Sequence, residues 1–158
     1  LPLKVKQAFT VKVTGLSKGD SVAAWTSSNS KVAIVKNGKI TAKKVGNVRI
    51  TVKLKSGLTK TIKVRVQKTD VATQSLKVNN KVSGKKIASN VTLKLKQTLK
   101  LSTEITPVTS KQKVTYATSN KKVATVNSKG VVTAKKKGKV TITVKSGKKT
   151  VKIKVTVK

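Results

Sequence analysis

The chain has 158 residues, with 38 lysines and arginines against three acidic residues and a formal net charge of +35. It contains neither cysteine nor histidine, which excludes disulfides, thiolate metal sites and the usual zinc sites. No apolar run reaches the length of about 18 residues that a membrane-spanning helix needs. Arg49 and Arg65 are the only arginines, so we expect the attraction to polyanions to be diffuse and sensitive to salt.

Apolar and polar residues alternate along most of the chain, which is the pattern of strands with one buried and one solvated face. In chain order, the pattern predicts strands over residues 9–13, 48–52, 62–66, 99–105, 140–144 and 150–158. Valine, isoleucine and threonine dominate these stretches, as they do in strands generally. No window repeats its apolar residues at helical spacing. The sequence therefore predicts an all-β protein.

Glycine-containing turns separate the predicted strands. Asn37-Gly38 is a strong candidate for a two-residue hairpin, because both residue types tolerate positive φ. Gly46 and Gly138 each precede a long predicted strand. Short strands separated by turns at this spacing are typical of a β-sandwich.

The sequence repeats itself. Residues 25–35 (WTSSNSKVAIV) return at 116–126 (YATSNKKVATV), and residues 38–46 return at 130–138 with one residue inserted between the two blocks. A period near 90 residues fits a whole small domain. We therefore predict one domain over residues 1–68, a linker over 69–74 and a second domain over 75–158.

The two copies also predict parts of the core. Trp25 aligns with Tyr116, and Ala23 aligns with Val114 two residues earlier. This places both aromatic side chains on the inner face of a central strand.

The first copy is shorter at its start than the second. Residues 93–97 align with residues 3–7, whereas residues 75–90 have no equivalent in the first copy. We expect the first copy to lack its opening edge strand, which lies upstream in a longer protein or is absent. The first copy is therefore predicted to be the less stable one.

Several motifs, in the same order in both copies, resemble the group 2 bacterial immunoglobulin-like domains. In the first copy they are WTSSN at 25–29, VAIV at 32–35 and GKITAKKVGNVRITV at 38–52; in the second, ATSN at 117–120, VATV at 123–126, GVVTA at 130–134 and GKVTITV at 138–144. The resemblance implies two tandem immunoglobulin-like β-sandwich domains. It also implies an extracellular setting, since such domains occur in tandem on bacterial and phage surface proteins.

The function that this resemblance implies is a non-catalytic spacer or adhesin segment of a bacterial cell-surface or secreted protein, monomeric within a longer multidomain chain. The alternative is an accessory polysaccharide-binding module of a secreted enzyme, which a row of exposed aromatic residues would favour. An intracellular nucleic-acid binder is the third possibility.

Catalytic and metal-binding chemistry finds no support in the residues. The three acids, Asp20, Asp70 and Glu104, are far apart in the sequence and form no matched pair in the two copies. Glycoside hydrolysis needs two carboxyl groups and calcium sites need several. We therefore expect neither an enzyme nor a cofactor.

Lysines occupy the same loop in both copies, namely Lys43, Lys44, Lys135, Lys136 and Lys137. One interpretation is a solvated surface that protects strand edges from aggregation. The other is a binding site for an anionic cell-wall polymer, such as teichoic acid, or for an acidic host glycan. Specific nucleic-acid binding is not expected, because the three aromatic residues are predicted to be buried and no helix is available to read a groove.

Overall fold

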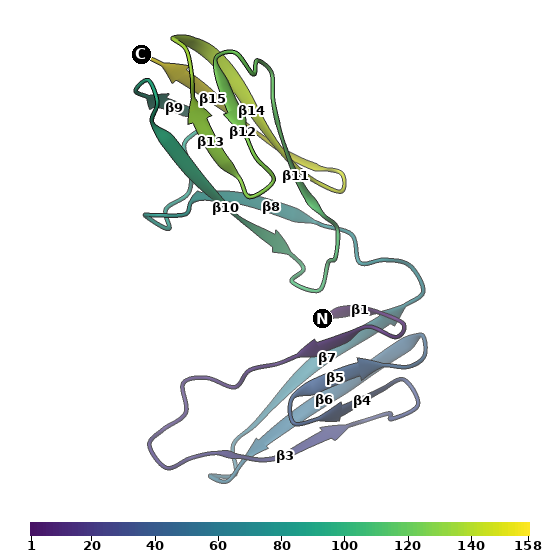
Figure 1. Cartoon of the computed structure of the whole chain (residues 1–158). Helices are drawn as coiled ribbons and strands as arrows, with labels where there is room; N and C mark the ends of the chain where they lie inside the picture. The colour runs from purple at the N-terminus through teal and green to yellow at the C-terminus, as the bar shows by residue number, and fades with distance from the viewer. The chain divides into compact units, whose positions relative to one another are not determined.

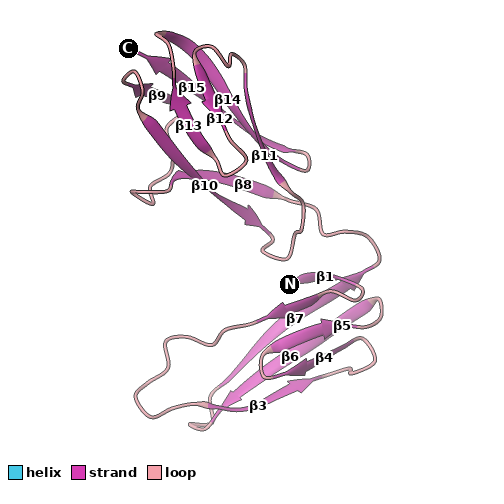
Figure 2. Cartoon of the chain, viewed as in Figure 1, coloured by secondary structure: helices cyan, strands magenta, loops and turns pink.

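The computed structural model describes all 158 residues, and it consists of strands and turns without any helix (Figure 2). No segment therefore forms a helix that could cross a membrane. The prediction of an all-β protein is confirmed. The chain divides into two compact units, which we call module 1 (Leu1–Val71) and module 2 (Ala72–Lys158). The division falls within the segment 69–74 that the sequence predicts as a linker.

Module 1 contains seven strands in two sheets (Figure 1). One sheet has the order β1-β7-β6-β3 and the other has the order β2-β5-β4. The strands are β1 (Pro2–Lys4), β2 (Ala8–Thr10), β3 (Val22–Ser27), β4 (Ala33–Lys36), β5 (Lys39–Ala42), β6 (Gly46–Leu54) and β7 (Thr59–Gln67). The pairing is antiparallel except between β1 and β7, which run parallel.

Module 2 repeats this arrangement and adds one strand. Its sheets have the orders β11-β14-β15-β9 and β12-β13-β10-β8. The strands are β8 (Ser75–Asn80), β9 (Asn90–Leu93), β10 (Thr98–Thr106), β11 (Val114–Thr118), β12 (Ala124–Val126), β13 (Val131–Ala134), β14 (Gly138–Ser146) and β15 (Lys149–Val157). Strands β9 to β15 correspond to β1 to β7 in order and in pairing, whereas β8 has no counterpart in module 1.

Each module has its own core between its two sheets, filled by the apolar side of the alternating strands. Module 2 has fourteen buried residues in its core cluster, and module 1 has nine. Both clusters consist of aliphatic side chains, and Trp25 and Tyr116 pack against them only partly buried. The predicted β-sandwich is confirmed, and the core of module 1 is the smaller one.

The predicted hairpin at Asn37-Gly38 is confirmed. Both residues have positive φ, 49° and 77°, and they connect β4 to β5 with Lys36 opposite Lys39. This backbone matches the right-handed twist of the paired strands. A side chain at Gly38 would also collide with the backbone, because a Cβ there would lie 2.6 Å from the carbonyl oxygen of Val11.

The position predicted for the two aromatic residues needs correction. Strands β3 and β11, which carry Trp25 and Tyr116, lie at the edges of their sheets and not at the centre. Alternation in one strand reports which side is buried, but the neighbours of a strand depend on pairing with residues far away in the sequence. The inward orientation itself holds, since both rings pack against the cores.

The alignment of Ala23 with Val114 is also wrong. Strand β3 contains a register shift between Val22 and Ala24, which leaves Ala23 as an extra residue. Val22 pairs with Leu54, and Val114 pairs with Ser146, the residue equivalent to Leu54. A β-bulge of this kind inserts one residue into one strand only, so Val22 occupies the place of Val114.

The strand predicted over residues 9–13 is shorter than expected. Strand β2 ends at Thr10, whereas its counterpart β10 continues to Thr106. The second half of β10, from Leu101 onward, pairs with β8. Since module 1 has no β8, the segment after Thr10 has no partner strand to pair with.

Candidate binding surfaces

The predicted lysine loops occupy equivalent places in the two modules. Lys43 and Lys44 lie between β5 and β6, and Lys135, Lys136 and Lys137 lie between β13 and β14. All five side chains are exposed. The loops therefore present two and three ammonium groups to solvent.

The backbone of each lysine loop is held in place by the same hydrogen bonds. The amides of Lys43 and Lys44 donate to the carbonyl oxygen of Val32 at 2.8 and 3.1 Å. The amides of Lys135 and Lys136 donate to Val123 in the same way, at 2.8 and 3.2 Å. These hydrogen bonds hold the backbone of the two loops in the same way.

Almost none of the positive charge is neutralised inside the protein. The single ion pair joins Lys4 Nζ to Asp70 Oδ1 at 2.8 Å, and both side chains are largely exposed. Glu104 accepts a hydrogen bond from Asn79 Nδ2 at 2.7 Å. The lysines of the two loops have no acidic partner, so an external polyanion meets no internal competitor.

Asp20 also interacts with polar groups instead of a cation. The hydroxyl of Ser56 donates to its Oδ2 at 2.7 Å, and the amides of Ser21 and Ser56 donate to its Oδ1. The Ser56 hydroxyl bond, together with these amides, lowers the pKa of Asp20 below its usual value. The ionised form of Asp20 is thus favoured, and the residue joins the loop before β3 to the turn between β6 and β7.

The structure brings the two arginines together, which sequence reasoning missed. Arg49 on β6 is paired with Lys63 on β7, and Arg65 lies two residues further along β7 on the same outer face. The three side chains are exposed and line a shallow hollow of about 560 Å³. Guanidinium groups bind carboxylate and phosphate in a planar, two-pronged geometry. The sequence showed only that both arginines lie on the polar side of their strands. Their position at one hollow depends on the pairing of β6 with β7, which the sequence did not reveal.

Module 2 has a hollow at the equivalent place, about 460 Å³ in volume, but without arginine. Thr141 takes the place of Arg49, and Lys154 takes the place of Lys63. The same hydrogen bond borders both hollows: the Arg49 amide donates to Ser28 Oγ at 3.0 Å, and the Thr141 amide donates to Ser119 Oγ at 2.9 Å. The scaffold of the hollow is therefore common to both modules, while its stronger anion-binding groups belong to module 1.

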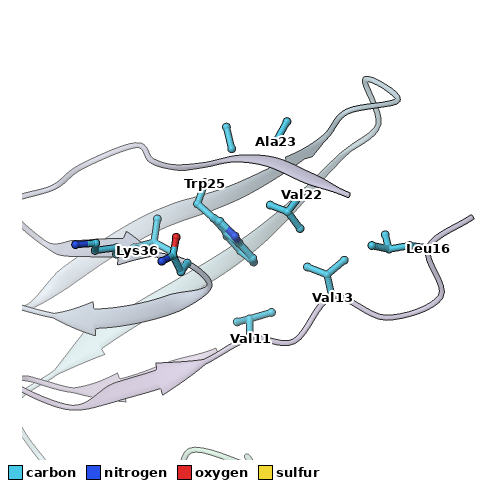
Figure 3. Close-up of a pocket in the computed structure, with 10 residues that line it drawn as sticks. Val11, Val13, Leu16, Val22, Ala23, Trp25 and Lys36 are labelled. Atoms are coloured by element: carbon cyan, nitrogen blue, oxygen red, sulfur yellow. The ribbon is translucent and has the colours of Figure 1, made fainter. Parts of the chain in front are cut away.

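A third hollow, of about 600 Å³, lies beside Trp25 in module 1. Most of its lining residues are apolar, although polar atoms make up the larger part of its exposed surface. Figure 3 shows Trp25 and Val22 of β3 on one side, facing Val11 and Val13 of the segment after β2. Leu16 borders the hollow and is 38% exposed. Sequence reasoning assigned Trp25 to the core and did not foresee that the core is open beside it.

The three acids lie apart from one another in the fold. Asp20 is in the loop before β3, Asp70 follows β7, and Glu104 is exposed on β10. No three carboxylates come together anywhere in the structure at a distance suitable for a metal ion. The candidate surfaces are the lysine loops, the arginine hollow with its counterpart in module 2, and the hollow beside Trp25.

Comparisons with known proteins give one family match. Residues 81–157 match the family model of the bacterial Ig-like domain, group 2. No curated protein matches the chain.

Among solved structures, the chain is similar to domains 4 and 5 of the S-layer protein SbsC, with 26% identity over 95% of this chain and 78% of that one and a TM-score of 0.45. A longer structure of SbsC, domains 4–9, gives 25% identity, coverage of 96% and 24%, and a TM-score of 0.46. A C-terminal fragment of intimin, in complex with the intimin-binding domain of its translocated receptor, gives 19% identity, coverage of 94% and 56%, and a TM-score of 0.37.

The family match covers nearly all of module 2, and the strands of module 2 form the sandwich that the family's description implies. Module 2 of this chain is a member of the group 2 bacterial immunoglobulin-like domain family.

Proposed function

We propose that this chain is a non-catalytic tandem of immunoglobulin-like domains from a bacterial cell-surface or secreted protein. In this proposal module 1 is a second copy of the same family domain. Seven strands of module 1 follow the order and pairing of β9 to β15, which supports this assignment. The chain would act as a spacer or adhesin segment outside the cell.

We further propose that the lysine loops dock the chain to an anionic polymer of the cell wall or to an acidic host glycan. The observation that carries this proposal is that both modules fix a lysine-bearing loop with the same backbone hydrogen bonds. A fixed loop repeated along a tandem suits a repetitive polyanion, because several weak contacts add up when they are linked.

The alternative, an accessory module that binds polysaccharide, would use aromatic rings to stack on sugars. Phe9, Trp25 and Tyr116 are the only aromatic residues, and all three pack against the cores. The surface thus offers no row of rings, which supports the spacer or adhesin over the polysaccharide-binding module.

The test compares two variants with the same loss of charge. The first carries Lys→Gln at Lys43, Lys44, Lys135, Lys136 and Lys137. The second carries Lys→Gln at five exposed strand lysines: Lys53, Lys60, Lys145, Lys149 and Lys152. Both would be applied to immobilised teichoic acid, heparin, mucin and DNA at 50 and 300 mM salt.

We expect the loop variant to lose roughly tenfold more affinity for teichoic acid or for an acidic glycan than the strand variant. The difference should persist at 300 mM salt, where the screening length is about 6 Å. Equal losses in the two variants, or equal elution from every polyanion, would show that net charge alone governs binding and that the loops are not a site.

A further inference from the structure

The hollow beside Trp25 lies where module 2 places a strand. In module 2, β8 pairs with the second half of β10, with Val78 opposite Thr103 and Leu76 opposite Ile105. Val78 is buried to 2% exposure, and Leu76 packs against the same core cluster as Tyr116. Strand β8 therefore closes the core of module 2 on this side.

Module 1 has an equivalent of Leu101, the residue at which the pairing of β10 with β8 begins in module 2. The amide of Val11 donates to the carbonyl of Gly38 at 2.9 Å, just as the amide of Leu101 donates to Gly130 at 2.9 Å. The ring of Trp25 lies next to Gly38, and the ring of Tyr116 lies next to Gly130. Val11 and Leu101 thus hold equivalent positions against equivalent aromatic side chains.

Beyond this point the two modules differ. Residues 101–106 pair with β8, whereas the backbone of residues 12–16 makes no hydrogen bond with the rest of module 1. Val13, Val22 and Leu16 line the hollow without belonging to the core cluster. Module 1 therefore presents both an unpaired backbone edge and apolar side chains that a strand could cover.

We propose that this hollow is an acceptor site for an extended polypeptide strand with the chemistry of β8. The strand would run antiparallel to residues 11–16 and carry two apolar side chains two residues apart, as Leu76 and Val78 are. Its backbone would supply the missing hydrogen bonds, and its apolar side chains would cover Trp25 and Val22. This site is separate from the lysine loops and does not depend on their function.

The correspondence between the modules gives a direct test. Leu3 of β1 occupies the place of Leu93 of β9, since the two residues pair with the equivalent residues Val66 and Val157. The turn after each strand is also the same: the amide of Lys4 donates to Gln7 Oε1, and the amide of Lys94 donates to Gln97 Oε1. A second copy of residues 75–90 placed directly ahead of Leu1 therefore restores the spacing of module 2. The matched control carries Leu76→Ser and Val78→Ser in the grafted copy alone.

Trp25 reports on the hollow directly, because it is the only tryptophan in the chain. With the graft we expect its emission to shift to shorter wavelength and the amides of residues 12–16 to gain roughly tenfold protection from hydrogen exchange. The control graft should produce neither change. Module 2 should be unaffected in all three proteins.

Two results would overturn the proposal: a graft that leaves Trp25 and residues 12–16 unchanged, or equal changes with the two grafts. If the grafted chain does not fold, a synthetic peptide with the sequence of residues 74–82 can be added to the unmodified chain. It should shift the Trp25 emission saturably, and the peptide with both serines should not. A concentration-dependent dimer that itself covers Trp25 would show that the occupant is a second copy, which also contradicts the proposal.

Discussion

A small cluster of hydroxyl groups shows how single residues hold module 2 together. Thr73 Oγ1 lies 3.0 Å from Ser110 Oγ and 2.9 Å from Ser146 Oγ, and all three residues are buried. The amide of Thr73 donates to Gln112 Oε1 at 2.7 Å. Buried polar groups need such partners, since an unpaired one costs more than a typical hydrogen bond contributes. The start of module 2 is thereby attached to two later segments of the same module.

Replacing Thr73 by valine keeps the shape of the side chain and removes its hydroxyl. We expect Thr73→Val to lower the free energy of unfolding of module 2 by about 1–3 kcal/mol, because Ser110 and Ser146 each lose a buried partner. Chemical denaturation followed through Tyr116 measures this change. Thr92→Val, at an exposed threonine of β9, is the control and should change the free energy of unfolding by less than about 0.5 kcal/mol.

The sequence largely predicted where the strands lie, but it did not predict which strands become neighbours. Alternation identified β6, β7, β10, β14 and β15, and the Asn37-Gly38 pair identified the hairpin between β4 and β5, because both signals are local. The bulge at Ala23 was not predictable, since only the pairing of β3 with β6 reveals an extra residue. The arginine hollow was missed for the same reason. The absence of an opening strand from module 1 was expected, but the sequence did not indicate that it leaves the core open beside Trp25. Each depends on which strands become neighbours.

Strand β8 is the one strand of module 2 that has no counterpart in module 1. Its contribution to the stability of module 2 can be measured. Val78→Ala removes part of a buried side chain from this strand, and we expect a loss of about 1–3 kcal/mol in the free energy of unfolding of module 2. Val82, which lies just after β8 and is 84% exposed, provides the control. Denaturation midpoints that are equal for Val78→Ala and Val82→Ala would show that β8 does not stabilise the core.

At the scale of the molecule, two related sandwiches of unequal completeness share one chain. We predict that module 1 unfolds at lower denaturant concentration than module 2, because its core is smaller and open beside Trp25. Fluorescence of Trp25 reports module 1, and hydrogen exchange of the amides in β14 and β15 reports module 2. Coincident transitions, or equal protection from exchange in the two modules, would contradict this prediction.

The scarcity of acids has a consequence beyond binding. With one ion pair and a formal charge of +35, the chain must be accompanied by dissolved small anions wherever it is crowded. A dense layer of such chains would retain these mobile ions and swell or shrink with the surrounding electrolyte. It would in effect behave as an anion-exchange material.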